Sequence, residues 1–451
     1  MSADVADPRA ADHNWRWFVW FRVLFAARFY YPVMAVLFLD LGLSASEYTL
    51  LNFVWALTIV AVDLPAGVLA DRIGRRPLVI AASVAMVAEM ILLCAAPRNG
   101  GTLLFVFCLA NRLLSGAAEG MANGADEALV FDSLAERGRE KDWPLVLDQV
   151  MRWQSLGFVV AMLVGGAVYD AGFLNRVLGT HFDQATTLRF PLYLTLLTAV
   201  ATLVVAIGLR EPVRQTAGAS AGGAEAPPPG PGAGAFSHVL SAGGWIARTP
   251  VALFVIVAGV MLDGVVRVFM TFSSSYLRLI DLPAASYGLI GAALGGLGLA
   301  VGPASRWLVK RGGPARNLAS LAVLALVGLA GVALRWRWWG LVWTVPLWVA
   351  MSVVTYLLSY YLNAVVDSRR RATVLSFKGL AVNLNYGLVS LAFAGVLRAV
   401  RDGGNPEETF GRALPWLPAW LGLALAVVAV GFWRWRADLG RVVQSDDAPE
   451  S

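Results

Sequence analysis

Long apolar stretches with few charged residues dominate this sequence. Stretches of about 18 to 25 residues recur about twelve times between Trp17 and Trp433, and each can cross a hydrocarbon core roughly 30 Å thick as a helix. Backbone amides in lipid must be bonded within the chain, and segments rich in Leu, Ala, Val and Gly achieve this as α-helices. Hydrophobic residues make up 58% of the chain and charged residues 15%, with a mean hydropathy of +0.65. These values are outside the range of soluble domains and predict an all-α polytopic membrane protein.

The expected spans form two sets of six, separated by a segment too rich in Gly, Ala and Pro to pack. Two similar sets predict a duplicated architecture with pseudo-two-fold symmetry and a substrate path between two six-helix bundles. The expected spans are 16–39, 47–69, 77–96, 102–130, 150–171 and 190–209, then 250–276, 285–308, 316–334, 340–364, 372–397 and 414–435. The expected parts are an N-terminal tail (1–15), a first bundle (16–209), a cytoplasmic linker (210–249), a second bundle (250–436) and a C-terminal tail (437–451).

Two local signals add detail to this organisation. Ser44 and Glu47 have the spacing of a capping box at the outer start of the second span. Residues 237–248 are compatible with a short surface helix within the linker.

The positive charges indicate orientation in the membrane. The net charge of +6 is spread over short loops and forms no single patch, so we expect no nucleic-acid partner. With the N-terminus inside, about 21 Lys and Arg fall in cytoplasmic segments and about nine in external ones, as the positive-inside rule predicts. We therefore expect both termini in the cytoplasm and a location in the plasma membrane, which is the inner membrane in a Gram-negative bacterium.

One loop carries a specific pattern of Gly, Asp and basic residues. The sequence GVLADRIGRR begins at Gly67, at the inner end of the second span. Gly67 permits close helix approach, Asp71 ends the span at the interface, and Gly74 permits a tight turn. The alternative is a positive-inside loop that contains an Asp by chance. The basic residues of the loop, expected in the cytoplasm, are Arg72, Arg75 and Arg76.

This loop resembles the signature loop of the major facilitator superfamily, and the resemblance extends over nearly the whole chain. It implies a transporter of twelve helices. In that family the Asp faces the start of the eleventh span, where the helix dipole favours an anion, and loop arginines pair with an acid at the inner end of span four. Asp132 matches that acid. The resemblance therefore implies that Asp71, Arg75 and Asp132 form a latch that holds one conformation. Arg306 stands at the corresponding position of the second half, so we expect the latch on one side only.

A second, shorter resemblance lies in span four. Arg112 and Gly116, in NRLLSGAAEG, match a family motif that is associated with proton coupling in antiporters. In span five, Ala161 and Met162 stand where antiporters of the drug-export branch have a Gly-Pro pair, which argues against that branch.

Several charged residues lie inside the expected spans. An ionised side chain at mid-bilayer costs roughly 2.5 to 3.5 kcal/mol on insertion scales, so such residues usually line a cavity or pair with each other. Arg112, Glu119 and Asp126 are seven residues apart, which predicts a single face of one helix. Asp263 and Arg267 are four apart and can pair. The other polar residues considered in the spans are Arg22, Arg28, Tyr30, Tyr31, Asp63, Glu89, Lys378, Asn383 and Asn385.

We expect Glu119 to be the leading candidate for proton exchange, because burial and a neighbouring arginine shift a carboxyl pKa in opposite directions. A helix-packing role is as good an explanation for Asp63, and snorkelling to the interface explains Lys378 better. The histidines, His13, His181 and His238, all lie outside the expected spans, so we expect no histidine relay.

Together these features predict secondary active transport of a small solute by alternating access, with protons as the coupling ion. An uncoupled facilitator is the nearest alternative, and a transporter-like receptor or sensor is one of another class. No HExxH or paired-Cys motif is present in the sequence, so we expect no enzyme activity, metal or other cofactor. The expected partners are a small-molecule substrate, protons and lipid, and we expect a monomer. The direction of transport and the substrate are left open.

Overall fold

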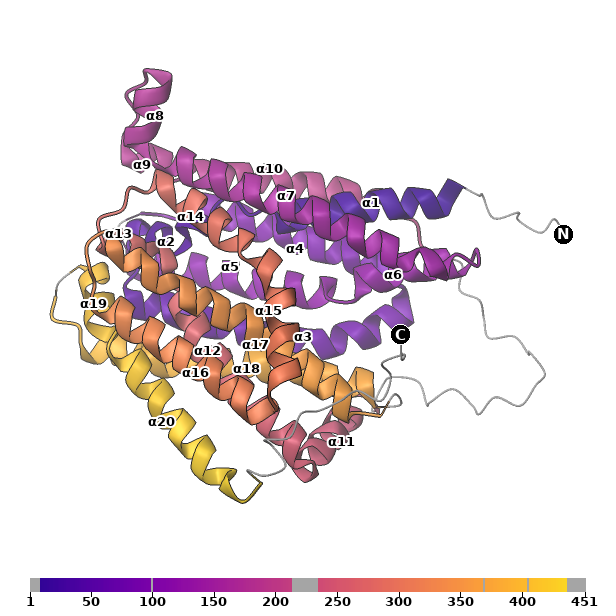
Figure 1. The fold of residues 1–451 in the computed structure, drawn as a ribbon. Coiled ribbons are helices and arrows are strands. Elements are labelled where there is room, and N and C mark those ends of the chain that lie inside the picture. Colours follow the sequence, from indigo (N-terminus) through magenta and orange to yellow (C-terminus); the bar gives the residue numbers. More distant parts are fainter. Residues whose placement is uncertain (1–8, 99, 213–233, 368–369, 404, 436–451) are drawn as a thin grey trace, which may run out of the picture. The chain divides into compact units, whose positions relative to one another are not determined.

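The computed structural model describes residues 9–98, 100–212, 234–367, 370–403 and 405–435, and these are helical without strands (Figure 1). Within these described residues, eleven helical segments are long and apolar enough to cross a membrane. The pair α14 (Ala285–Gly296) and α15 (Gly298–Arg311) is bent by 41° and makes a twelfth if it is one span. The prediction of an all-α polytopic membrane protein is confirmed, with eleven or twelve candidate spans in the described residues.

The chain folds into two compact units that do not follow the sequence order strictly. One unit draws on Met1–Pro32 and Thr58–Ala235, and the other on Val33–Leu57 and Phe236–Ser451. The C-terminal end of span one and the N-terminal half of span two therefore pack with helices from the C-terminal half of the chain. The division expected from the sequence assigned all of 16–209 to one bundle.

In the first unit, α1 packs against α6, α7 and α10, and α4 packs against α5, α6 and α10. Proline occupies the first turn of α7 and of α10, where its missing N–H costs no hydrogen bond. The helices of this unit are α1 (Arg9–Ala26), α4 (Arg75–Ala95), α5 (Gly101–Ala122), α6 (Ala125–Ala135), η2 (Glu140–Asp142), α7 (Trp143–Tyr169), α8 (Ala171–Leu178), α9 (Gln184–Thr187) and α10 (Phe190–Gly208), with the C-terminal part of α3 (Ala45–Ile73).

In the second unit, α12 is the central helix and packs against α16, α17, α18 and α20. The helices of this unit are η1 (Tyr31–Val33, at the boundary), α2 (Met34–Leu41), the N-terminal part of α3, α11 (Gly234–Arg248), α12 (Pro250–Thr271), α13 (Ser273–Leu279), α14, α15, α16 (Pro314–Ala333), η3 (Trp339–Trp343), α17 (Thr344–Val365), α18 (Arg371–Ala399), α19 (Pro406–Ala413), α20 (Trp416–Gly431) and η4 (Trp433–Trp435).

The local signals outside the spans are confirmed. The Ser44 N–H donates to Glu47 Oε2 at 2.8 Å and the Glu47 N–H donates to Ser44 Oγ at 3.2 Å, which is a capping box at the start of α3. α11 includes the expected surface helix, so the linker expected over 210–249 is helical from Gly234. The Gly- and Pro-rich middle of that linker and the C-terminal tail lie outside the described residues.

The first span is present but is not one continuous helix. α1 ends at Ala26 and a helical turn resumes only at Tyr31, and the backbone between them makes only short-range bonds, such as the Tyr31 N–H to the Arg28 carbonyl oxygen at 3.1 Å. Two hydroxyls of α10 add to these bonds. The Phe29 N–H donates to Thr195 Oγ1 at 3.0 Å, and Thr198 Oγ1 donates to the Ala27 carbonyl oxygen at 3.2 Å. Unwound backbone at membrane depth is tolerated where protein groups bond it in this way.

The fourth span is also broken, between α5 and α6. Gly124 has φ +78°, a left-handed conformation that glycine adopts without steric cost. Asp126 therefore lies in the first turn of α6, whereas Arg112 and Glu119 lie on α5. The prediction that one helix carries all three residues is wrong at Asp126, because the glycine restarts the helix between them.

The unwound stretch of span one packs closely against α7. A Cβ atom on Gly165 would lie 1.8 Å from the Phe29 carbonyl oxygen, so no larger residue fits without movement of the backbone. We predict that Gly165→Ala lowers the thermal stability of the purified protein, since overpacking typically costs about 1 to 3 kcal/mol. The measurement is the melting temperature in detergent.

Gly67→Ala is the matched control, because a Cβ there would meet no described atom within 4 Å. Equal melting of the two variants would contradict the packing of the unwound stretch.

Candidate functional site

A buried arginine lies at the break in span one. The Arg28 side chain is 1% exposed and forms an ion pair with Glu89 of α4, whose side chain is 0% exposed. Its second terminal nitrogen, Nη2, lies 3.9 Å from Glu119 Oε1 of α5. The two carboxylates therefore share one guanidinium. They differ in exposure, because the Glu119 side chain is 36% exposed and the Glu89 side chain is buried. Glu89 holds the arginine firmly, whereas Glu119 is held loosely at the edge of the pair.

Neighbouring side chains fix this cluster in place. The Arg28 guanidinium lies 5.5 Å from the centre of the Phe25 ring, within range of a cation–π contact. Asn111 Nδ2 of α5 donates to the backbone carbonyl oxygen of Glu89 at 3.0 Å, which ties α5 to α4 beside the ion pair. A buried arginine needs such partners, because removal of one partner leaves an uncompensated charge.

A second cluster joins α1 to α6. Arg22 Nη1 lies 3.0 Å from Asp126 Oδ2 and Arg22 Nη2 lies 3.2 Å from Glu127 Oε1. The Asp126 side chain is 0% exposed, whereas Glu127 is half exposed. The structure thus gives Asp126 and Glu119 different arginines, both from span one. Arg112 is buried on α5.

The loop between α3 and α4 brings part of the expected latch together. Arg75 Nη1 lies 2.5 Å from Asp132 Oδ2 at the inner end of span four. Gly74 has φ +103°, which fits the expected tight turn, and Arg72 is exposed. The side chain of Asp71 lies outside the described residues, so its partner stays a prediction.

Glu211, which sequence reasoning missed, completes this loop. Its Oε1 accepts from the Arg75 N–H at 2.9 Å and its Oε2 accepts from the Arg76 N–H at 2.7 Å, so one carboxylate caps the start of α4. Arg76 Nη2 also donates to the Ile207 carbonyl oxygen at 2.8 Å. The available signal was an acid two residues beyond the sixth apolar stretch, which we read only as part of the linker.

The second unit contains its own charged pair. Asp263 Oδ1 and Arg267 Nη2 lie 2.9 Å apart on α12, and Asp263 is 2% exposed against 26% for Arg267. The arginine lies 5.5 Å from the centre of the Tyr386 ring, and Tyr386 shares a hydrogen bond of 2.9 Å with Thr271. Asn385 Nδ2 donates to the Val260 carbonyl oxygen at 2.8 Å and so joins α18 to α12. Sequence reasoning missed Tyr386.

The remaining candidates have local partners. Asp63 Oδ1 accepts from Asn123 Nδ2 at 3.0 Å, beside the break in span four. Lys378 Nζ donates to Ser359 Oγ at 2.8 Å, which joins α18 to α17. Among the described residues no group of three or more His, Cys, Asp or Glu side chains has the geometry of a metal site.

Another ion cluster in the second unit was not expected. Arg278 of α13 binds both oxygens of Asp40, at 2.6 and 2.8 Å, and Glu407 Oε1 at 2.9 Å. Asp40 is on α2 and Glu407 is on α19, so this arginine joins three helices. The Ser274 hydroxyl, one turn earlier, accepts from the Ala35 N–H at 3.0 Å. These bonds hold the outer end of span one in the second unit.

The family model of the Major Facilitator Superfamily matches residues 17–390. The chain therefore belongs to the Major Facilitator Superfamily and is a multi-pass membrane transporter, in a family whose members bind small-molecule substrates. No curated protein sequence matches it.

Solved structures of two transporters share the fold. A mutant form of the nucleoside transporter NupG matches with a TM-score of 0.70 at 12% identity, covering 94% of this chain and 100% of that one. A bacterial homologue of the human lysosomal transporter Spinster, in an inward-facing and unoccupied conformation, matches with a TM-score of 0.68 at 14% identity, covering 97% and 100%. At these identities the likeness concerns the fold alone.

The cap on α4 makes a direct prediction. Glu211→Ala removes the acceptor of two backbone N–H groups, and a lost helix cap costs about 1 kcal/mol. We expect a lower melting temperature for this variant, measured on purified protein in detergent. Glu140→Ala, at an exposed acid at the start of η2, is the control and should melt with the parent. A Glu211→Ala variant as stable as the parent would contradict the role of this cap.

Proposed function

We propose that this transporter is a proton-coupled secondary transporter that works by alternating access, and that Glu119 is the residue that exchanges the proton. The observation that carries this proposal is the sharing of Arg28 between Glu89 and Glu119. Of the buried arginine's two acidic neighbours, only Glu119 keeps contact with the space outside the protein interior. A proton that arrives from that space reaches Glu119 first.

Protonation changes the charge balance of the cluster. When Glu119 is ionised, it attracts the Arg28 guanidinium, and when it is neutral this attraction is lost while Glu89 stays paired. Such a change needs one acid that stays paired with the arginine and a second acid that is paired weakly enough to take up a proton. By contrast, Asp126 and Asp263 each have an arginine within 3.0 Å and fit a structural role better.

The location of Arg28 along the chain links this charge change to movement. The boundary between the two compact units falls between Pro32 and Val33, four residues after Arg28. The backbone there is already unwound, so it can change conformation without loss of helical hydrogen bonds. A change in the bonding of Arg28 therefore acts where the chain passes from one unit to the other.

Each conformation of an alternating-access transporter needs contacts that break when the protein changes to the other conformation. In the second unit, Asp40 and Arg278 join span one to span seven, and we propose that these contacts form in one conformation and break in the other. The loop at the opposite end of span two, with Arg75 paired to Asp132, is the proposed inner latch. Both sets use exposed or half-exposed ion pairs, which are weak enough to exchange.

An uncoupled facilitator is the second candidate function. The pairing of Asp126 with Arg22, and of Asp263 with Arg267, favours it, because paired charges need no proton to be stable in the membrane. A protonophore separates the two functions, since it abolishes concentrative movement only in a coupled transporter. A protein that binds a solute but moves none in liposomes would instead support the receptor alternative.

We propose the plasma membrane as the location, with both termini in the cytoplasm. The basic loops support this orientation, because they alternate along the chain as the positive-inside rule requires. We propose a substrate that carries polar or charged groups, since the described clusters of both units contain charges of both signs.

The proton proposal predicts the behaviour of Glu119→Gln. At an imposed difference of one pH unit, one coupled proton supplies about 1.4 kcal/mol, which supports about a tenfold concentration ratio. We expect the parent in proteoliposomes to build such a ratio, and Glu119→Gln to bring the solute only to equal concentrations on both sides. The measurement is solute flux with and without the pH difference.

Asp148→Asn is the control for this experiment, because it removes an exposed carboxylate of α7 that pairs with Arg152. It should retain the full response to pH. Fully proton-dependent transport by Glu119→Gln would remove the assignment of Glu119, and a parent that never concentrates its solute would favour the facilitator.

The one-sided latch predicts unequal effects of two loops. Asp71→Asn should shift the balance between conformations far more than Arg306→Gln, because only the first loop carries the acid expected to face a helix start. Accessibility of single cysteines at the two membrane sides to a water-soluble thiol reagent reports this balance. Equal shifts from both variants would contradict the one-sided latch.

A further inference from the structure

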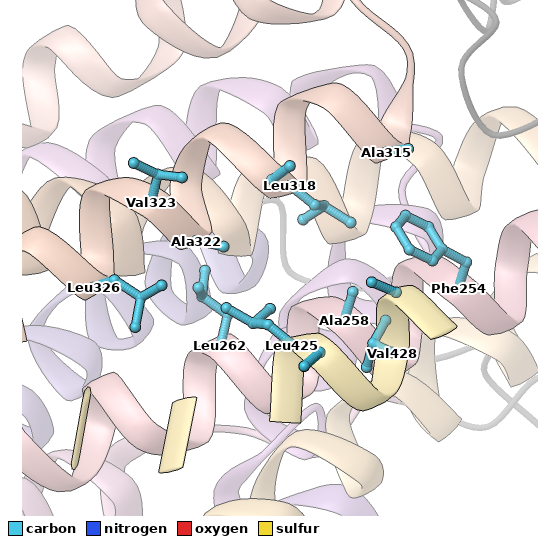
Figure 2. Close-up of a pocket in the computed structure, with 13 residues that line it drawn as sticks. Phe254, Ala258, Leu262, Ala315, Leu318, Ala322, Val323, Leu326, Leu425 and Val428 are labelled. Atoms are coloured by element: carbon cyan, nitrogen blue, oxygen red, sulfur yellow. The ribbon is translucent and has the colours of Figure 1, made fainter. Parts of the chain in front are cut away.

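An apolar groove lies in the second unit, away from every charged cluster described above. It has a volume of about 360 Å³ and lies between α12, α16 and α20 (Figure 2). Small side chains create the space, with Ala258 on α12, Ala319 and Ala322 on α16, and Ala426 and Ala429 on α20. All three helices are candidate membrane spans, and Ala319, Val323 and Ala426 of the lining are exposed, so the groove is open at the surface of these helices.

The length of the groove matches one leaflet of a bilayer. Along α16 its lining runs from Ala315 to Leu326, and eleven residues of helix rise about 16 Å. Half of a hydrocarbon core roughly 30 Å thick is about 15 Å. Figure 2 shows Phe254, Ala315 and Val428 toward one end of the groove and Val323 and Leu326 toward the other.

The end of the groove near Ala315 is basic and aromatic. Arg316, next to Ala315, is exposed, and so is Arg434, five residues beyond Ala429. Trp433 and Trp435 flank that arginine with 64% and 38% exposure, as side chains at a headgroup interface do. The sequence has no Asp or Glu in 248–255, 311–320 or 428–435, the three stretches at this end.

We infer that this groove binds one acyl chain of an anionic phospholipid, with the phosphate near Arg316 and Arg434. The apolar lining accepts the chain, the leaflet-deep length fits it, and the arginines match the charge of the headgroup. The proposed site is independent of the proton coupling, since no residue of the Arg28 cluster takes part.

Native mass spectrometry of the full chain in detergent, with added phosphatidylglycerol or phosphatidylcholine, tests this inference. We expect one phosphatidylglycerol to be retained more strongly than phosphatidylcholine. Each of Arg316→Gln and Arg434→Gln should weaken phosphatidylglycerol binding by about fivefold and leave phosphatidylcholine unchanged, since one arginine near a lipid surface contributes about that factor. Arg152→Gln, which removes an exposed cation of α7, is the control and should have no effect.

Two groove-filling variants test the position of the chain. Ala319→Phe and Ala426→Phe fill the groove from opposite walls, and both alanines are exposed, so the helices can accept the larger rings. Each variant should lose the retained lipid. The inference is overturned if both lipids bind equally, if the arginine variants bind like the parent, or if the filled variants retain the lipid. A dimer peak that disappears in the filled variants would also overturn it, because the occupant would then be a second copy of the chain.

Discussion

A buried arginine in an unwound part of the first span is the feature on which the other polar groups of the first unit depend. Arg28 needs an acid within the membrane, and Glu89 supplies it with a side chain that has no exposure of its own. The unwound backbone beside it needs hydrogen bonds, and two threonines of α10 supply them. α7 approaches closely enough that position 165 accepts only glycine. Three helices, α4, α7 and α10, thus pack around a single unwound stretch.

The second unit is organised by packing around α12, and its polar groups lie at the margins of that core. Asp263 and Arg267 pair along α12 itself, whereas Arg278 gathers Asp40 and Glu407 near the outer helix ends. The apolar groove occupies the side of the same helix that faces α16 and α20. One helix therefore contributes a charged pair, a packing core and a wall of the proposed lipid site. The separation of charged and apolar functions follows from the high cost of an unpaired charge in lipid.

The sequence predicted much of the fold, because hydropathy and length define a membrane span almost independently of its neighbours. The i, i+4 pair of Asp263 and Arg267 was equally predictable from helix geometry. The breaks near Arg28 and Gly124 were not, since they depend on hydroxyls and glycines of other helices. The match of Asp132 to the family motif predicted that Arg75 and Asp132 lie close together. The contacts of Glu211 and Tyr386 became apparent only from the tertiary structure. Helical periodicity alone did not predict that a new helix begins just before Asp126, because that helix starts at a left-handed glycine.

We propose that Glu119 gains and loses a proton while Glu89 stays paired with Arg28. Infrared difference spectroscopy of the protein in lipid, recorded between two pH values, detects protonated carboxyl groups directly. We predict a carboxylic acid C=O band that changes with pH in the parent, is absent in Glu119→Gln and persists in Asp132→Asn. A band that survives unchanged in Glu119→Gln would contradict the account.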